Sequence, residues 1–179
     1  AHSPMDYYLV NLSEPEEPKR LTRSLSPVID PDDLVKVEVV KFKSYDGLEI
    51  PGYLYRPKVS FAETPVPALI YLHGGPGGQS TRTWDERHQH LLNHGYAIFS
   101  VNHRGSGGYG KTFLSLDDRR HGEADLGDIL SARDWLATLE WVDGERIGLL
   151  GDSYGGYLTL TLLSLHPESF EVGVAGHGA

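Results

Sequence analysis

Two glycine-rich stretches of this sequence contain residues that could carry chemistry, and they predict different reactions. Gly105–Thr112 fits G-x-x-x-x-G-K-[ST], a loop whose backbone amides and lysine hold nucleotide phosphates. With Gly107 and Gly110, the same stretch also fits G-x-G-x-x-G, the dinucleotide-binding pattern. Gly151–Gly155 fits G-x-S-x-G, the sharp strand-to-helix turn that exposes a serine nucleophile. The nucleotide pattern fixes more positions and recurs by chance less often, so the surrounding sequence must decide between the two.

The serine motif lies where such a turn needs to be. Residues 147–150 predict a short buried strand and residues 154–165 predict a helix, which puts Ser153 on the turn between them. The flanking glycines remove side chains that would crowd the helix against the strand. The hydroxyl of Ser153 is then exposed at the carboxyl edge of the sheet, where the amide of Tyr154, at the helix N-terminus, can donate to a developing oxyanion.

A second glycine-rich turn supports the same chemistry. The sequence HGGPG, residues 73–77, directly follows the first buried strand. Hydrolases with a G-x-S-x-G turn build the other half of the oxyanion hole here, from a backbone N–H of an H-G-G loop. Taken alone, HGGPG fits an ordinary tight turn equally well, but its place ahead of the serine motif favours the oxyanion hole.

The surroundings of the nucleotide pattern fit poorly. A phosphate loop needs a strand running directly into its first glycine and a long helix after it, but three residues separate strand 96–101 from Gly105, and Gly122 ends any helix early. An acidic magnesium ligand at Asp152 would leave the serine motif unexplained. The dinucleotide reading needs an acid at the end of a second strand, and Asp125 and Asp128 lie at that distance on a predicted helix.

The N-terminal part of the chain predicts antiparallel structure. Residues 5–12 predict a strand, residues 13–20 (SEPEEPKR) a polar hairpin turn, and residues 21–27 a short returning piece. Prolines and acidic residues then indicate a linker. From Val35 onwards, alternating valines predict a half-buried strand, and Asp46-Gly47 is a strong hairpin signal.

The rest of the chain predicts an α/β domain. Residues 48–57 form the second strand of the hairpin, with Pro51 indicating an edge strand or a bulge. Strands and helices then alternate, which is typical of a mainly parallel sheet. We expect strands at residues 68–73, 96–101, 147–150 and 170–176, and helices at residues 84–93, 124–140 and 154–165.

Composition narrows the possible partners. The 179 residues carry a net charge of −9, which argues against nucleic acid, and no apolar run approaches membrane-spanning length. With no cysteine and no visible signal peptide, a cytoplasmic location is expected. His88 and His90 beside two acids are the one hint of a metal cluster, but such a group is usually a solvated surface, so we expect no metal and no cofactor.

At this point the sequence resembles the prolyl oligopeptidase family of serine peptidases, most closely its acylaminoacyl-peptidase-like branch. HGGPGG, NHRGSGGYG, DLGDILSARDWL and GDSYGGY stand in that family's order and approximate spacing. The resemblance implies two parts. Residues 1–30 would hold a remnant of the last β-propeller blade and a linker, and residues 31–179 the N-terminal part of an α/β-hydrolase domain. The resemblance also implies that the match of Gly105–Thr112 to the nucleotide pattern is accidental.

The resemblance implies roles for individual residues. Ser153 is similar to the family's nucleophile, and Tyr154 and Gly75 to its two backbone oxyanion donors. His73 resembles a histidine that shapes the loop, and Arg104 resembles a structural arginine of the glycine-rich loop. In α/β-hydrolases the orienting acid and then the catalytic histidine follow the serine in the chain.

Few residues follow Ser153, and their histidines are poorly placed. His166 lies at a helix end, ahead of the nearby acids, and His177 comes one strand too early. We therefore expect the triad's acid and base outside this chain, whose parallel sheet looks unfinished, with His177 or His73 as weaker candidates for the base. Such a piece is expected to be inactive alone.

The function that fits best is a serine peptidase that hydrolyses peptide or acyl-amino-acid bonds. Its expected partners are a peptide or acyl-peptide substrate and the C-terminal half of the hydrolase domain, with oligomerisation left open. A carboxylesterase and a prolyl iminopeptidase on the same fold are the alternatives within the class. A nucleotide-binding protein that uses Gly105–Thr112 and a non-catalytic hydrolase-like domain are the alternatives outside it.

Overall fold

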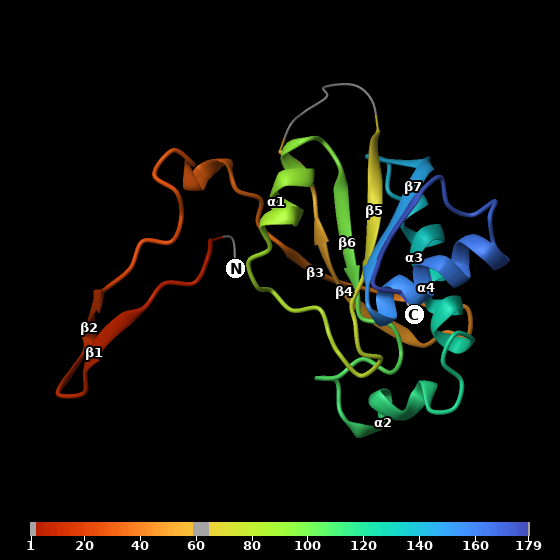
Figure 1. The fold of residues 1–179 in the computed structure, drawn as a ribbon, viewed down its shortest axis with the longest axis horizontal. Helices are drawn as coiled ribbons and strands as arrows, with labels where there is room; N and C mark the ends of the chain where they lie inside the picture. The colour runs from red at the N-terminus through yellow and green to blue at the C-terminus, as the bar shows by residue number, and fades with distance from the viewer. Residues whose placement is uncertain (1–2, 59–64, 179) are drawn as a thin grey trace.

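The computed structural model describes residues 3–58 and 65–178. Within these residues, six strands form a central sheet in the order β3-β4-β6-β5-β7-β8 (Figure 1). Strands β3, β4 and β6 pair antiparallel, whereas β6, β5, β7 and β8 are parallel to one another. The bounds are β3 (Glu38–Lys43), β4 (Glu49–Tyr55), β5 (Val66–Leu72), β6 (Ala97–Val101), β7 (Val142–Asp152) and β8 (Gly173–Gly176). This confirms the α/β fold with a mostly parallel sheet.

Helices cover both faces of the sheet because side chains alternate along each strand. Ile98 of β6 packs with Leu92 of helix α1 (Glu86–Asn93) on one face. Its neighbour Phe99 packs on the other face in the main core, with side chains of α3 (Ala124–Ala137) and α4 (Tyr154–Leu165). The fully buried side chains of this main core include Ile70, Phe99, Ile129, Leu149 and Leu158. Each contributes about 1.5–3 kcal/mol by burial.

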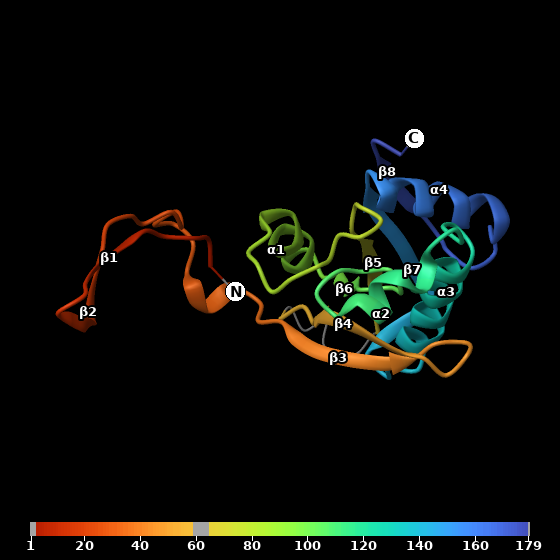
Figure 2. The same cartoon turned by 90° about the horizontal axis from the view of Figure 1, so that it is seen from below.

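The N-terminal segment forms a separate hairpin of β1 (Tyr8–Asn11) and β2 (Glu14–Arg20), which extends away from the main sheet (Figure 2). The prediction that residues 13–20 form a polar turn is therefore wrong. Their glutamates, prolines and lysine have low strand propensity, but backbone pairing with β1 and the bonds of Asp6 to Arg20 and Thr22 hold them extended. The register pairs Asn11 with Glu14, which leaves two residues for the turn.

Two expectations about strands in the main sheet are also wrong. The strand expected at residues 147–150 starts earlier, at Val142, because Val142 pairs with Val66 across an irregularity in the β5 register; β7 therefore includes Asp143 and Gly144, a pair typical of turns. Pro51 lies in β4, which has neighbours on both sides, and its pairing with β3 shows no bulge. The missing N–H of Pro51 is tolerated because β6 ends at Val101, opposite Gly52, and beyond that point Pro51 only has to accept a bond from Asn102.

The remaining helix, α2 (Lys111–Leu114), is a single turn, followed by the short 3-10 segment η2 (Ser115–Asp117). A comparable 3-10 segment, η1 (Pro31–Asp33), lies between the hairpin and the sheet. In the described parts of the chain, no helix combines the length and apolar character needed to cross a membrane.

Candidate active site

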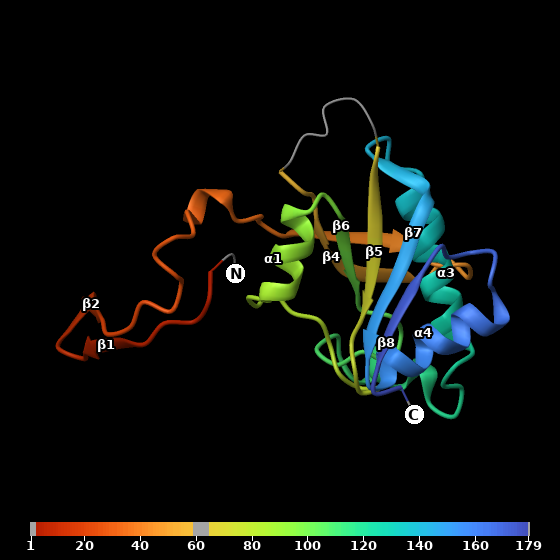
Figure 3. The ribbon, with the colours of Figure 1, turned by 45° about the horizontal axis from the view of Figure 1, so that its top comes forward.

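Ser153 occupies a strained turn between β7 and α4. Its backbone has φ 55° and ψ −120°, a region that non-glycine residues rarely adopt, and it is the N-cap residue of α4. The helix lies close to β7 and β5: a Cβ at Gly151 would overlap the Gly155 backbone, and a Cβ at Gly155 would overlap the carbonyl of Leu72. The turn and the reason for its glycines agree with the sequence prediction. β5, β7 and β8 run side by side here (Figure 3).

The HGGPG loop lies directly against the serine. A Cβ at Gly74 would lie 3.3 Å from the Cβ of Ser153, so no side chain separates the loop from the nucleophile. His73 is buried, and burial lowers its pKa to about 4, so the ring is neutral at pH 7. Its Nδ1 donates to the carbonyl of Gly74 at 2.8 Å, and its Nε2 lies 2.8 Å from the hydroxyl oxygen of Ser106, which itself donates to the carbonyl of His103 at 2.6 Å. Both nitrogens are thus used within loops, which argues against His73 as the base.

A cavity of about 360 Å³ opens beside Ser153. The three residues singled out from the sequence, Ser153, Tyr154 and Gly75, all line it. Among the described residues, His121, Tyr157 and His177 line it as well. Tyr157 could have been found, because it lies three residues after Tyr154 on the predicted helix and therefore on the same face. His121 lies in an irregular connection, where no periodicity marks it.

Tyr154 is fixed by a carboxylate of another helix. Its hydroxyl donates to Oδ2 of Asp125 at 2.5 Å, and Asp125 is completely buried in the first turn of α3. Burial, together with this bond, raises the pKa of the Tyr154 hydroxyl above its ordinary value, so it stays a donor. The bond holds the residue that follows the nucleophile against α3, which had been predicted only as a packing helix.

His177 also reaches the cavity, but from an exposed position. Its Nδ1 donates to Oδ1 of Asp152 at 2.8 Å, and this bond lowers the pKa of Asp152. Its side chain is 89% exposed. Among the residues that the structure describes, no hydrogen bond joins the hydroxyl of Ser153 to a histidine.

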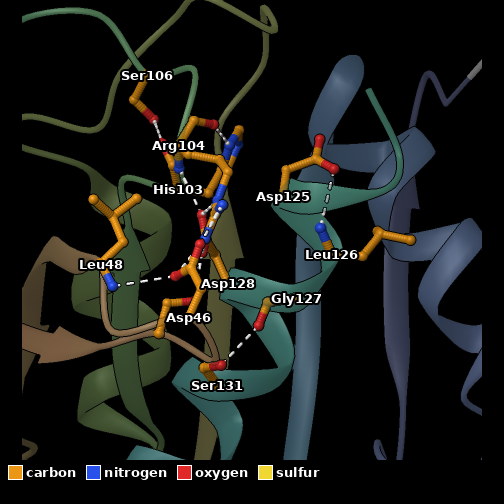
Figure 4. A network of polar contacts seen from close by, with 11 residues as sticks. Asp46, Leu48, His103, Arg104, Ser106, Asp125, Leu126, Gly127, Asp128 and Ser131 are labelled. Carbon is orange, nitrogen blue, oxygen red and sulfur yellow. Dashed lines mark hydrogen bonds and ion pairs between the residues drawn. The ribbon is translucent and has the colours of Figure 1, made fainter. Parts of the chain in front are cut away.

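In the glycine-rich loop after β6, Arg104 is bound by the carboxylates of Asp128 and Asp46 (Figure 4). Arg104 donates from its backbone N and from Nε to Oδ2 of Asp128, at 2.8 and 2.9 Å, and from Nη2 to Oδ1 at 2.8 Å. It also bonds Asp46 from Nη1 at 2.9 Å. Burial alone would lower the pKa of Arg104, but the bonds to Asp128 and Asp46 raise it.

The contacts of residues 105–112 argue against a phosphate site in this loop. The loop packs on the HGGPGG loop, with the amide of Gly107 donating to the carbonyl of Gly78 at 2.8 Å. The helix that begins at Lys111 has a single turn, and Arg104 is already paired with two carboxylates. The loop therefore forms a wall beside the HGGPGG loop, as the poor surroundings of the nucleotide pattern indicated.

Comparison with known proteins gives two family matches. The sequence model of the prolyl oligopeptidase family matches residues 83–179, which include the turn at Ser153. A model of acetyl xylan esterase matches residues 6–123.

Individual relatives agree with the first match. Dipeptidyl aminopeptidase BIII of Pseudoxanthomonas mexicana is 32% identical over 97% of this chain and 26% of its own length. The acylamino-acid-releasing enzyme of Sus scrofa is 32% identical over 70% of this chain and 17% of its own. The solved structure of Pyrococcus horikoshii acylaminoacyl peptidase has a TM-score of 0.84 and 31% identity, over 98% of this chain and 28% of that one. The chain thus spans about a quarter or less of the curated relatives named here.

Proposed function

The chain belongs to the prolyl oligopeptidase family, and on that premise we propose that it is the nucleophile-bearing part of a serine peptidase. The observation that carries the proposal is the meeting of three features at one cavity: a strained Ser153, the adjoining HGGPG loop, and the start of α4. The substrate class is peptide or acyl-amino-acid bonds, in line with the names of the relatives.

In the proposed mechanism, the hydroxyl oxygen of Ser153 attacks the carbonyl carbon of the scissile bond. The backbone N–H groups of Tyr154 and Gly75 donate to the oxyanion that forms, and one such donor is worth about 2.7–4 kcal/mol of transition-state stabilisation. The bond from Tyr154 to Asp125 and the packing of Gly74 on Ser153 support the donors from either side.

Proton transfer requires a base and an orienting acid. A histidine takes the proton of the serine and returns it to the leaving amine, while a carboxylate holds the imidazole. We place both groups in sequence that follows this segment, because in α/β-hydrolases the acid and then the histidine come after the serine. His177 pairs with Asp152 through Nδ1, but within the described residues it makes no hydrogen bond to the hydroxyl of Ser153.

The N-terminal hairpin supports a second part of the proposal. We propose that residues 1–30 hold strands of a β-propeller blade and a linker, and that residues 31–179 hold the first part of the hydrolase domain. Every residue of β1 and β2 is exposed, including Tyr8 and Leu9. A lone two-stranded hairpin is marginal in water, so further strands are expected to pack beside it.

The experiment is active-site labelling of the full-length protein with a fluorophosphonate. We expect labelling of Ser153, and its loss in Ser153→Ala but not in the matched control Ser164→Ala, whose hydroxyl is exposed on the same helix. A wild-type protein that resists labelling, or one labelled equally after Ser153→Ala, would refute the proposal.

A carboxylesterase is the second candidate, favoured by the match to acetyl xylan esterase. The two are separated by comparing kcat/KM for acetylated amino-acid anilides and for p-nitrophenyl acetate. A peptidase hydrolyses the anilides efficiently, whereas an esterase cleaves only the activated ester.

A further inference from the structure

The connection between η2 and α3, residues 118–123, brings to the cavity an imidazole that the proposed mechanism does not use. His121 lines the same cavity as Ser153 and Gly75. Its ring meets the ring of Tyr154 edge to face, with centroids 5.8 Å apart. Its side chain is 41% exposed, so a bound molecule can reach it.

The position of His121 is set by the turn at Gly122, whose conformation is fixed by its contacts. Gly122 has φ 75°, and a Cβ there would overlap the hydroxyl of Tyr157. The amide of Gly122 donates to Oδ2 of Asp125 at 3.3 Å, and the amide of Arg120 donates to the carbonyl of Asp117 at 2.8 Å. The turn therefore holds the ring of His121 against the ring of Tyr154.

A buried carboxylate lies behind His121. Oδ2 of Asp117 is 3.4 Å from Nε2 of His121, and Asp117 is 2% exposed. Oδ2 makes no hydrogen bond within the described residues. Burial raises the pKa of Asp117, and the facing imidazole opposes that rise. The contact is long for a hydrogen bond, and it can shorten when a ligand orders the ring.

This arrangement decides which ring nitrogen is available. Because Nε2 faces the carboxylate, Nδ1 is left for a bound molecule, and in the neutral imidazole with its proton on Nε2, Nδ1 accepts a hydrogen bond. His177 has the opposite arrangement: its Nδ1 bonds Asp152, so its Nε2 is the nitrogen left for a bound molecule. Both imidazoles of the cavity are thus backed by carboxylates.

The lining favours a donor-rich, basic side chain. Neither lysine nor arginine is among the described lining residues, and the rings of Tyr154 and Tyr157 offer faces that attract a guanidinium or ammonium group. The carboxylates behind the two imidazoles add negative potential.

We propose that His121, held by Asp117, is a specificity-determining residue: its Nδ1 accepts a hydrogen bond from an arginine or lysine on the acyl side of the scissile bond. The proposal rests on the peptidase function proposed above. It assigns to residues 117–121 a role in substrate choice, distinct from the attack by Ser153.

The test compares kcat/KM of the full-length protein for acetyl-arginine and acetyl-norleucine p-nitroanilides at about pH 8. The wild type is expected to prefer arginine by about tenfold or more, the effect of one hydrogen bond to a charged group. His121→Phe keeps the ring and should bring the arginine-to-norleucine ratio close to one. Asp117→Asn should lower the ratio in the same direction, and the exposed His90→Phe should leave it unchanged.

The ratio separates recognition from damage to the fold. If both substrates lose rate in parallel and the ratio is kept in His121→Phe, the residue is structural and the proposal is overturned. A wild type without preference for arginine overturns it as well. Failure of fluorophosphonate labelling in the wild type would instead overturn the peptidase function, so the two proposals fail in different experiments.

Discussion

The two carboxylates that bind Arg104 should contribute very differently to stability. Asp128 is completely buried and accepts from Ser44 as well as from three N–H groups of Arg104. Asp46 bonds the same guanidinium, but its side chain is 40% exposed. The matched changes are Asp128→Asn and Asp46→Asn, which keep the shape and remove one charge each.

The expected magnitudes follow from burial. Asp128→Asn places an amide NH₂ against donors and leaves the buried face of Arg104 without its counter-charge. Breaking a buried ion pair in this way costs about 3–5 kcal/mol of unfolding free energy. Asp46→Asn leaves Asp128 in place and removes a half-exposed pair, which costs at most about 1 kcal/mol. The difference between the two variants should therefore be at least about 2 kcal/mol.

The assay is differential scanning calorimetry of the full-length protein at one pH and scan rate. For a domain of this size, about 2–4 °C of Tm corresponds to 1 kcal/mol. Asp128→Asn should lower the Tm of the hydrolase domain by roughly 6 °C or more, and Asp46→Asn by a few degrees at most. Asp134→Asn, exposed on the same helix, is the control and should change little. Equal losses for Asp128→Asn and Asp46→Asn would refute the argument that burial sets the cost.

Two further predictions concern the loops around Ser153. Gly155→Ala should lower the unfolding free energy, measured by urea titration, by about 1–3 kcal/mol, because the new Cβ overlaps the carbonyl of Leu72. The same change should abolish fluorophosphonate labelling of Ser153. The control is Gly77→Ala, whose new Cβ meets only a flexible leucine side chain and should leave the unfolding free energy nearly unchanged. His73, whose pKa burial lowers to about 4, binds a proton more readily in the unfolded chain, so stability should be full above about pH 6.5 and fall by about 3 kcal/mol as the pH drops from there to 4. His73→Gln should flatten that part of the curve, and an unchanged slope in the variant would contradict the assignment.

The turn at Ser153 could be predicted because its requirements are local. A short apolar run, two glycines around a serine and an apolar helix stand consecutively in the sequence, and the close packing of Gly155 on Leu72 follows from that order. The family resemblance drawn from the motifs is likewise confirmed. The roles of Tyr154 and Gly75 as oxyanion donors stay predictions.

The errors have a common cause in pairing between distant segments. The strand Glu14–Arg20 has a turn-like composition and becomes extended only by pairing with β1. Asp143 and Gly144 form a strong local turn signal, yet β7 starts before them because Val66 pairs with Val142. Proline at position 51 is acceptable inside the sheet because β6 stops one residue short of it. Local patterns contain none of this information.

The lining of the cavity could not be predicted from local sequence patterns either. His121 reaches it through a turn whose geometry depends on Tyr157, Asp125 and Asp117, and none of these contacts has a spacing that could be recognised beforehand. Arg104, by contrast, was predicted as structural through the family resemblance, while its partners Asp46 and Asp128 were not.

Asp125 and Asp128 have a further consequence for α3. They are three residues apart, and one bonds Tyr154 of α4 whereas the other bonds the loop at Arg104. Because each residue of an α-helix advances by about 100°, one residue inserted between them would turn one carboxylate away from its partner. The rotation of α3 about its own axis is therefore set by two polar contacts on different neighbours, in addition to the apolar packing that any helix at this position would provide.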